Sequence, residues 1–219
     1  MKTSQVRSTY HKSVLVEPIL QHSPGASKIL FDFTLGGGGH SQALLAMHPD
    51  LKLYGFDRDL DALEEATNNL DDYQSRMTLQ QFKFSDAVDW IKDQNLKADY
   101  IIADLGISSH HVDTDSRGFS FNKEGPLDMR MDQGASFSAM NVINEYSQKE
   151  LETIFYTYGE ERFSKRVAQR IINARELAAI DSTKQLAEII FHAIPRKFHP
   201  KRNHPATKIF QAIRIEVNQ

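Results

Sequence analysis

Residues 31–40 run Phe31-Asp32-Phe33-Thr34-Leu35-Gly36-Gly37-Gly38-Gly39-His40, with four consecutive glycines between an apolar stretch and a helical pattern. Glycine has no Cβ, so such a run lets the backbone turn sharply and pass close to a ligand. Residues 28–33 predict a strand, and residues 41–47 predict a helix whose free N–H groups suit a carboxylate or a phosphate. The stretch therefore predicts a ligand-binding turn at the carboxyl edge of a parallel sheet.

The sequence on either side of this turn alternates apolar runs with helical patterns, which is typical of an α/β fold with a parallel sheet. Helices are expected over residues 41–47 and 60–70, and a further one, capped by Ser85 or Asp86, is expected to run to Ile91. Strands are expected at 28–33, 51–56, 77–84 and 99–103. We predict that these first four strands, within residues 1–107, form the cofactor-binding domain.

Beyond Asp104 the pattern changes. Residues 105–134 carry several glycines and no clear period, so they predict a long loop. Helical periodicity returns at 147–155, 162–177 and 183–193, breaks at 195–205, and resumes at 206–217. We therefore expect a loop-rich, helical insert over 108–205, and over 206–219 the start of a helix that returns to the first domain.

Composition limits the classes of function. Of 219 residues, 40% are hydrophobic and 25% charged, enough for a folded core, and cysteine is absent, which excludes disulfides and thiolate chemistry. No apolar run approaches the length of a membrane span, and the polar start lacks a signal peptide, so a cytoplasmic location is expected. Residues 151–219 hold 12 Lys/Arg against 7 Asp/Glu, while residues 1–150 hold 14 against 22. This asymmetry indicates a polyanionic partner or an ordinary solvated surface.

Three further residues follow predicted strands. Asp57 ends the second strand, where a carboxylate can accept hydrogen bonds from both ribose hydroxyls of an adenosine. Phe84 ends the third strand and either stacks on an adenine or belongs to the core. Asp104 ends the fourth and is either a helix cap or a site residue, and we favour the site.

The glycine loop leaves three alternatives open. The dinucleotide pattern G-x-G-x-x-G/A places Ser41 at its third small position, which is off pattern, and the phosphate-binding P-loop would require a lysine that this loop lacks. Methyltransferase loops are looser and follow an acidic residue, as Asp32 does here. A methyl-donor site is favoured over a dinucleotide site, and a purely structural turn is the third alternative.

Taken together, the longer motifs resemble the bacterial 16S ribosomal RNA cytosine-N4 methyltransferase family (RsmH, also called MraW), from about His11 to Asn218. Besides the glycine loop they are His11-Lys12-Ser13-Val14-Leu15, Asp104-Leu105-Gly106-Ile107-Ser108-Ser109, Arg117-Gly118-Phe119-Ser120-Phe121, Gly125-Pro126-Leu127-Asp128-Met129-Arg130-Met131, Tyr158-Gly159-Glu160-Glu161-Arg162, and His204-Pro205-Ala206-Thr207 leading to Phe210-Gln211-Ala212-Ile213-Arg214.

The resemblance implies a Rossmann-like class I fold, S-adenosyl-L-methionine as cofactor, and methyl transfer to the exocyclic N4 of a decoding-centre cytosine. The implied partner is the 16S rRNA within the small ribosomal subunit, with no membrane and with a homodimer left open. The implied cofactor contacts are Gly38, Gly39, His40, Asp57, Phe84, Asp104 and His111. The His111 contact replaces a glutamine that is usual in the family.

For catalysis, we hypothesise that Asp104 or the nearby backbone carbonyls orient the target amine, with Ser108 and Ser109 lining the pocket. Asp128 and Arg130 are either a second part of that pocket or a buried pair that holds the loop. The basic segment 195–205 has no acidic residue and is either an RNA-contact loop or an ordinary solvated loop, and RNA contact is favoured. Its RNA-contact candidates are Arg196, Lys197, Phe198, His199, Lys201 and Arg202. The histidines show no metal-ligand spacing, so no metal is expected.

Similar proteins continue well beyond the position of Gln219 with residues that would supply the last strands of the sheet. We therefore expect an incomplete sheet with an open edge that exposes apolar surface and lowers stability. The alternative to an active enzyme is a truncated, catalytically impaired RNA- or ribosome-binding remnant.

Overall fold

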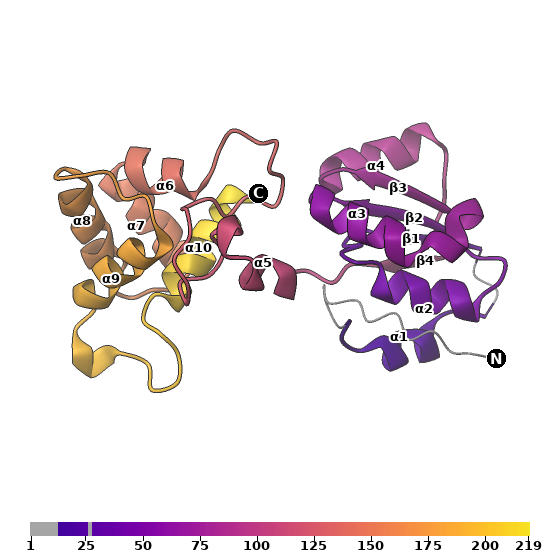
Figure 1. Cartoon of the computed structure of the whole chain (residues 1–219), viewed down its shortest axis with the longest axis horizontal. Coiled ribbons are helices and arrows are strands. Elements are labelled where there is room, and N and C mark those ends of the chain that lie inside the picture. Colours follow the sequence, from indigo (N-terminus) through magenta and orange to yellow (C-terminus); the bar gives the residue numbers. More distant parts are fainter. Residues whose placement is uncertain (1–12, 26–27) are drawn as a thin grey trace. The chain divides into compact units, whose positions relative to one another are not determined.

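The computed structural model describes residues 13–25 and 28–219, except the side chain of Ser109. The motif residues His11 and Lys12 lie outside the described residues. The chain forms two compact units, residues 1–109 and 110–219 (Figure 1). Among the described residues, no helix combines the length and the apolar character needed to cross a membrane.

The first unit is built on a parallel sheet of β1 (Ile29–Asp32), β2 (Lys52–Asp57), β3 (Met77–Gln81) and β4 (Tyr100–Ile102), in the order β3-β2-β1-β4. This order is that of the first four strands of doubly wound nucleotide-binding folds, and the strand order reverses between β1 and β4. The predicted α/β fold class is confirmed. β4 is an edge strand of this sheet, and its Ile101 side chain is 58% exposed.

Helices cover both faces of this sheet. Leu30 and Leu53 pack on one face with side chains from α2 (Gly39–Met47) and α3 (Leu60–Asn69). Phe31 and Phe56 point to the opposite face, because side chains alternate along a strand, and they pack there with α4 (Phe84–Asp93). The remaining elements of this unit are α1 (Val16–His22), which precedes β1, and the 3₁₀ turn η1 (Asp71–Arg76).

The third strand is shorter than the sequence predicts. It ends at Gln81, and Phe84 is the first residue of α4 rather than the last residue of the strand. The expected cap by Ser85 or Asp86 is also wrong, because Lys83 is the N-cap and makes no side-chain capping bond. The aromatic residues at 82 and 84 favour a strand, but strand propensity is weak and tertiary contacts override it.

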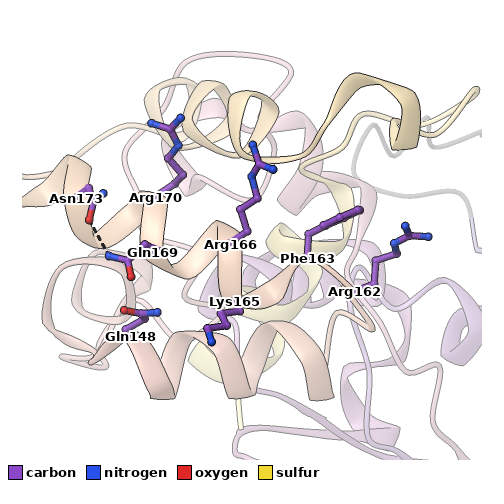
Figure 2. A pocket seen from close by; sticks show the side chains of 8 residues that line it. All are labelled: Gln148, Arg162, Phe163, Lys165, Arg166, Gln169, Arg170 and Asn173. Atoms are coloured by element: carbon purple, nitrogen blue, oxygen red, sulfur yellow. Dashed lines mark hydrogen bonds between the residues drawn. The ribbon is translucent and has the colours of Figure 1, made fainter.

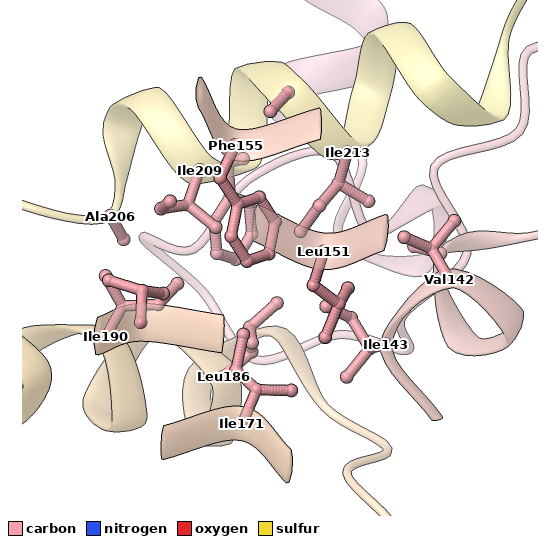
Figure 3. Close-up of a cluster of buried hydrophobic side chains, with 14 of the residues drawn as sticks. Val142, Ile143, Leu151, Phe155, Ile171, Leu186, Ile190, Ala206, Ile209 and Ile213 are labelled. Carbon is pink, nitrogen blue, oxygen red and sulfur yellow. The ribbon is translucent and has the colours of Figure 1, made fainter. Parts of the chain in front are cut away.

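The second unit is helical. It contains α5 (Ser109–Asp113), which starts at the last residue of the first unit, η2 (Asp115–Arg117), α6 (Ala139–Glu145), α7 (Gln148–Thr157), α8 (Ser164–Arg175), α9 (Thr183–Ala193), η3 (Arg196–Phe198) and α10 (Thr207–Val217). Its core includes Leu151, Phe155, Ile171 and Leu186 (Figure 3). Of these elements α5, η2 and α6 do not stand out in the sequence, because they are single turns or short helices.

The last helix belongs to this second unit. Its residues Ile209, Phe210 and Ile213 are fully buried in the helical core, and α10 packs on α6 and α7. The sequence-based division placed residues 206–219 with the first domain, whereas here the apolar stripe of α10 completes the core of the helical unit. The break at 195–205 is therefore a loop within one unit.

Candidate functional site

The glycine loop connects β1 to α2 and requires glycine at two positions. Gly36 and Gly38 have φ angles of +52° and +78°, which side chains rarely adopt. A Cβ on Gly38 would also lie 3.1 Å from a methyl carbon of Leu70. The loop is fixed by bonds from the Leu35 amide to the Phe56 carbonyl (3.1 Å) and from the Gly38 amide to the Leu35 carbonyl (2.8 Å).

Asp57 lies at the carboxyl end of β2 and holds this loop. Its Oδ2 accepts the amide of Gly36 at 2.9 Å, and its Oδ1 accepts the amide of Asp59 at 3.0 Å. A carboxylate has about four lone-pair sites, so each oxygen can accept more than one hydrogen bond. The structure thus brings together the glycine loop and the carboxylate that were predicted to share one site.

Asp32 has a structural role that sequence reasoning did not assign. Its side chain is buried and accepts bonds from the Ser41 hydroxyl (2.7 Å) and the Thr34 amide (3.1 Å). Burial raises the pKa of Asp32 to about 6, although both of these bonds act in the opposite direction. Asp32 therefore ties the end of β1 to the first turn of α2.

The imidazole of His40 is used by the fold. It is 8% exposed, and its Nε2 lies 2.7 Å from the carbonyl oxygen of Val14. The neighbouring Gly39 faces Ser13, because a Cβ there would clash with the Ser13 hydroxyl. Residues 13–14 therefore pack over the start of α2, and only the backbone of His40 remains a candidate cofactor contact.

Phe84 and Asp104 follow β3 and β4 on the same edge of the sheet. Phe84 is 50% exposed and meets Phe33 edge to face, with 6.1 Å between ring centres. Asp104 is exposed, and its amide donates a 2.7 Å bond to the Thr34 hydroxyl in the glycine loop. The loops after β1 and β4 are thus joined where the strand order reverses, which is where ligands of open α/β sheets bind.

The remaining candidates near the family motif differ in environment. Ser108 is half-buried, and the side chain of Ser109 lies outside the described residues. His111 belongs to the second unit, where its ring is buried and stacks on Phe119 with 4.6 Å between centres. That packing gives the His111 side chain a place in the core of the helical unit.

Asp128 and Arg130 form a bidentate salt bridge. Both Nε and Nη2 of Arg130 lie 2.7 Å from oxygens of Asp128, and Arg130 also donates to the carbonyls of Gln133 and Ala135. These contacts favour the alternative in which the pair holds the loop.

The basic segment 195–205 packs partly on aromatic side chains. Arg162 lies 4.1 Å from the ring centre of Phe198, and Nε2 of His199 lies 2.8 Å from the carbonyl oxygen of Ile194. Phe198 is 39% exposed, while Arg196, Lys197, Lys201 and Arg202 are exposed. The predicted RNA-contact residues are therefore mainly solvent-facing cations beside an aromatic ring.

A parallel sheet in this order, with a glycine loop after β1 and carboxylates after β2 and β4, defines a Rossmann-like methyltransferase fold. The chain belongs to the MraW methylase family, whose sequence model matches residues 8–219.

Curated relatives agree with this assignment. Proteins named "Ribosomal RNA small subunit methyltransferase H" are 44% identical in Trichlorobacter lovleyi over 213 residues (96% of this chain, 68% of the relative). The protein of the same name from Trichodesmium erythraeum is 46% identical over 191 residues, which cover 87% of this chain and 65% of the relative. The one from Gloeothece citriformis is 43% identical over 223 residues, which cover 100% of this chain and 72% of the relative. The chain spans about two thirds of the length of these relatives.

Proposed function

We propose that this protein transfers a methyl group from S-adenosyl-L-methionine to the exocyclic N4 of a cytosine in the decoding centre of small-subunit ribosomal RNA. The observation that carries the proposal is the bond between Asp57 and the glycine loop, which joins the two halves of a nucleoside-binding edge. The names of the relatives support ribosomal RNA as the substrate. The cytosine and its N4 come from the motif resemblance.

The residues at this edge fit the cofactor. Among the described residues, the amides of Gly37 and Gly39 donate no hydrogen bond, and they lie at the positive end of α2, which suits a carboxylate. Asp57 is the acceptor for ribose hydroxyls, and the exposed ring of Phe84 is available to an adenine. When bound, S-adenosyl-L-methionine supplies a methyl group on a sulfonium, which is electrophilic.

The chain must also activate the target amine. Cytosine N4 is a poor nucleophile, because its lone pair is delocalised into the ring. Asp104 is the exposed carboxylate at the switch point, and it orients the N4 amine and accepts its proton. Ser108, with Ser109 beside it, lines the target pocket. Alignment of the amine supplies much of the rate.

The experiment is methyl transfer to small ribosomal subunits that lack the modification, followed by digestion to nucleosides and mass spectrometry. The proposal expects N4-methylcytidine, and it expects Asp104→Ala to abolish transfer. Asp93→Ala, which removes an exposed carboxylate at the end of α4, is the matched control. A different methylated nucleoside would contradict the cytosine N4 assignment, and no transfer by the wild-type protein would contradict the enzymatic function.

A further inference from the structure

A pocket on the helical unit is lined almost entirely by cations and amides. It measures about 460 Å³ and lies along the solvent side of α8, with Gln148 from the start of α7 at its border (Figure 2). Its lining residues are Gln148, Arg162, Phe163, Lys165, Arg166, Gln169, Arg170 and Asn173. We call this surface the α8 groove.

The cations of the α8 groove form one stripe. Lys165, Arg166 and Arg170 lie on one face of α8, opposite the buried Val167 and Ile171, and Arg162 lies in the turn just before the helix. They are exposed, and within the described ranges 13–25 and 28–219 none of the four has an ion pair. The sequence of α8 contains no acidic residue.

This charge is not placed to stabilise the helix. Lys165 and Arg166 occupy the second and third positions of α8, at the end where the helix dipole is positive and cations are unfavourable. An ordinary solvent-exposed helix face would carry charges of both signs or place acidic residues at the N-terminus of the helix. A bound anion would offset both the dipole and the mutual repulsion of the cations.

The stripe continues onto the predicted RNA-contact segment. Arg162 lies 4.6 Å from the ring centre of Phe163 and 4.1 Å from that of Phe198, and Lys197 lies 5.0 Å from Phe198. These contacts join the α8 groove to η3, so the cations of both elements form one surface. Stacking on two rings also restricts the Arg162 guanidinium before any ligand binds.

We propose that the α8 groove binds the sugar–phosphate backbone of the substrate RNA. This inference rests on the proposed function and adds an RNA-binding surface to it. From Lys165 to Arg170 the stripe covers five residue steps, about 7.5 Å of helix, and Arg162 extends it before the helix begins, so the stripe can contact more than one phosphate. Arginine matches phosphate with two parallel N–H donors. Gln148, Gln169 and Asn173 add amide groups that can bond a ribose 2′-hydroxyl.

The test compares Arg166→Ala/Arg170→Ala with Lys92→Ala/Lys97→Ala, which removes two exposed cations from the first unit. A fluorescein-labelled single-stranded RNA oligonucleotide is titrated by anisotropy at several salt concentrations. The arginine pair should weaken binding about ten-fold near 0.1 M salt and reduce the salt slope by about 1.4, the value for two phosphates on single strands. The lysine pair should stay within about two-fold of wild type.

Equal losses in both variants, or no loss in the arginine variant, would overturn the assignment. Binding to phosphatidylserine-containing vesicles that depends on the same arginines and exceeds RNA binding would instead indicate a membrane surface. Anisotropy reports binding alone. A protein that needs these arginines to bind RNA yet transfers no methyl group would therefore support the α8 groove and contradict the proposed function.

Discussion

The hydroxyl of Ser41 donates a 2.7 Å hydrogen bond to Oδ2 of Asp32, and both residues are buried where β1 meets α2. The same carboxylate accepts the Thr34 amide at 3.1 Å. Burial nevertheless prevails and raises the pKa of Asp32 from 3.8 to about 6. Folding therefore favours the protonated form of Asp32. The carboxyl group that anchors the glycine loop thus has a pKa well above the usual value for an aspartate.

This raised pKa predicts a pH dependence of stability. The contribution of protonated Asp32 is fully present below pH 3.8 and is lost as pH rises through about 6. Asp32→Asn cannot titrate, so the difference in unfolding free energy between wild type and variant should change by about 2 kcal/mol between about pH 4.5 and about pH 7.5, to the disadvantage of wild type at the higher pH. Urea unfolding at both pH values measures it. A difference that stays constant with pH would show that Asp32 keeps an ordinary pKa.

The loop of the helical unit depends on glycine at position 118. Gly118 has φ +68°, and a Cβ there would clash with the Pro126 carbonyl and lie 2.9 Å from the Asp128 amide. Gly118→Ala should lower the unfolding free energy by roughly 2 kcal/mol or more, since backbone cannot move aside easily. Gly134→Ala, whose Cβ would meet only a flexible Asp132 oxygen, is the control and should cost less than about 1 kcal/mol. Similar losses in the two variants would refute the steric argument.

The pair of Asp128 and Arg130 should stabilise the same loop. Burial acts to raise the pKa of Asp128, but the hydrogen bonds from Arg130 outweigh it and hold that pKa below its usual range. Arg130→Ala should lower the unfolding free energy by about 1–3 kcal/mol near neutral pH, because it leaves a half-buried carboxylate without its main donors. Arg130→Lys should restore only part of this.

The sign of the pH effect is set by the lowered pKa. The stabilisation by the Asp128–Arg130 pair is fully present above pH 3.8, the pKa of Asp128 in the unfolded chain. It is lost as the pH falls through the lower pKa that Asp128 has in the folded protein. The free energies of unfolding of wild type and Arg130→Ala should therefore become more similar when urea unfolding is measured at strongly acidic pH. A gap that widens on acidification would contradict the role assigned to the pair.

The four strands could be predicted because strands covered on both faces show as short apolar runs, and because parallel strands bring their carboxyl ends together. The sequence pattern therefore predicts Asp57 and Asp104 on one edge of the sheet, as the parallel strand order has them. The same reasoning misplaced Phe84, because aromatic content does not distinguish the end of a strand from the first turn of a helix.

Other features depend on contacts between distant segments. His40 follows the glycines directly, yet its ring is held by Val14, and no sequence pattern shows that bond. The cations of α8 have the spacing of any solvated helix face, so only their lack of carboxylate partners within the described ranges and the contact of Arg162 with Phe198 distinguish them. The sequence likewise does not show that α10 belongs to the helical unit, because its apolar residues pack on helices that are distant in the sequence.

The central claim is that the glycine loop and Asp57 bind S-adenosyl-L-methionine, and calorimetric titration of the purified protein tests it most directly, with NAD as the competing cofactor. Wild type should bind S-adenosyl-L-methionine and not NAD. Asp57→Ala should weaken binding by more than about ten-fold, because it removes the charge-assisted hydrogen bonds to both ribose hydroxyls. Asp50→Ala, which removes an exposed carboxylate, should leave the affinity unchanged. Circular dichroism would verify that each variant is folded. Binding of NAD instead, or unchanged affinity in a folded Asp57→Ala variant, would contradict the cofactor site.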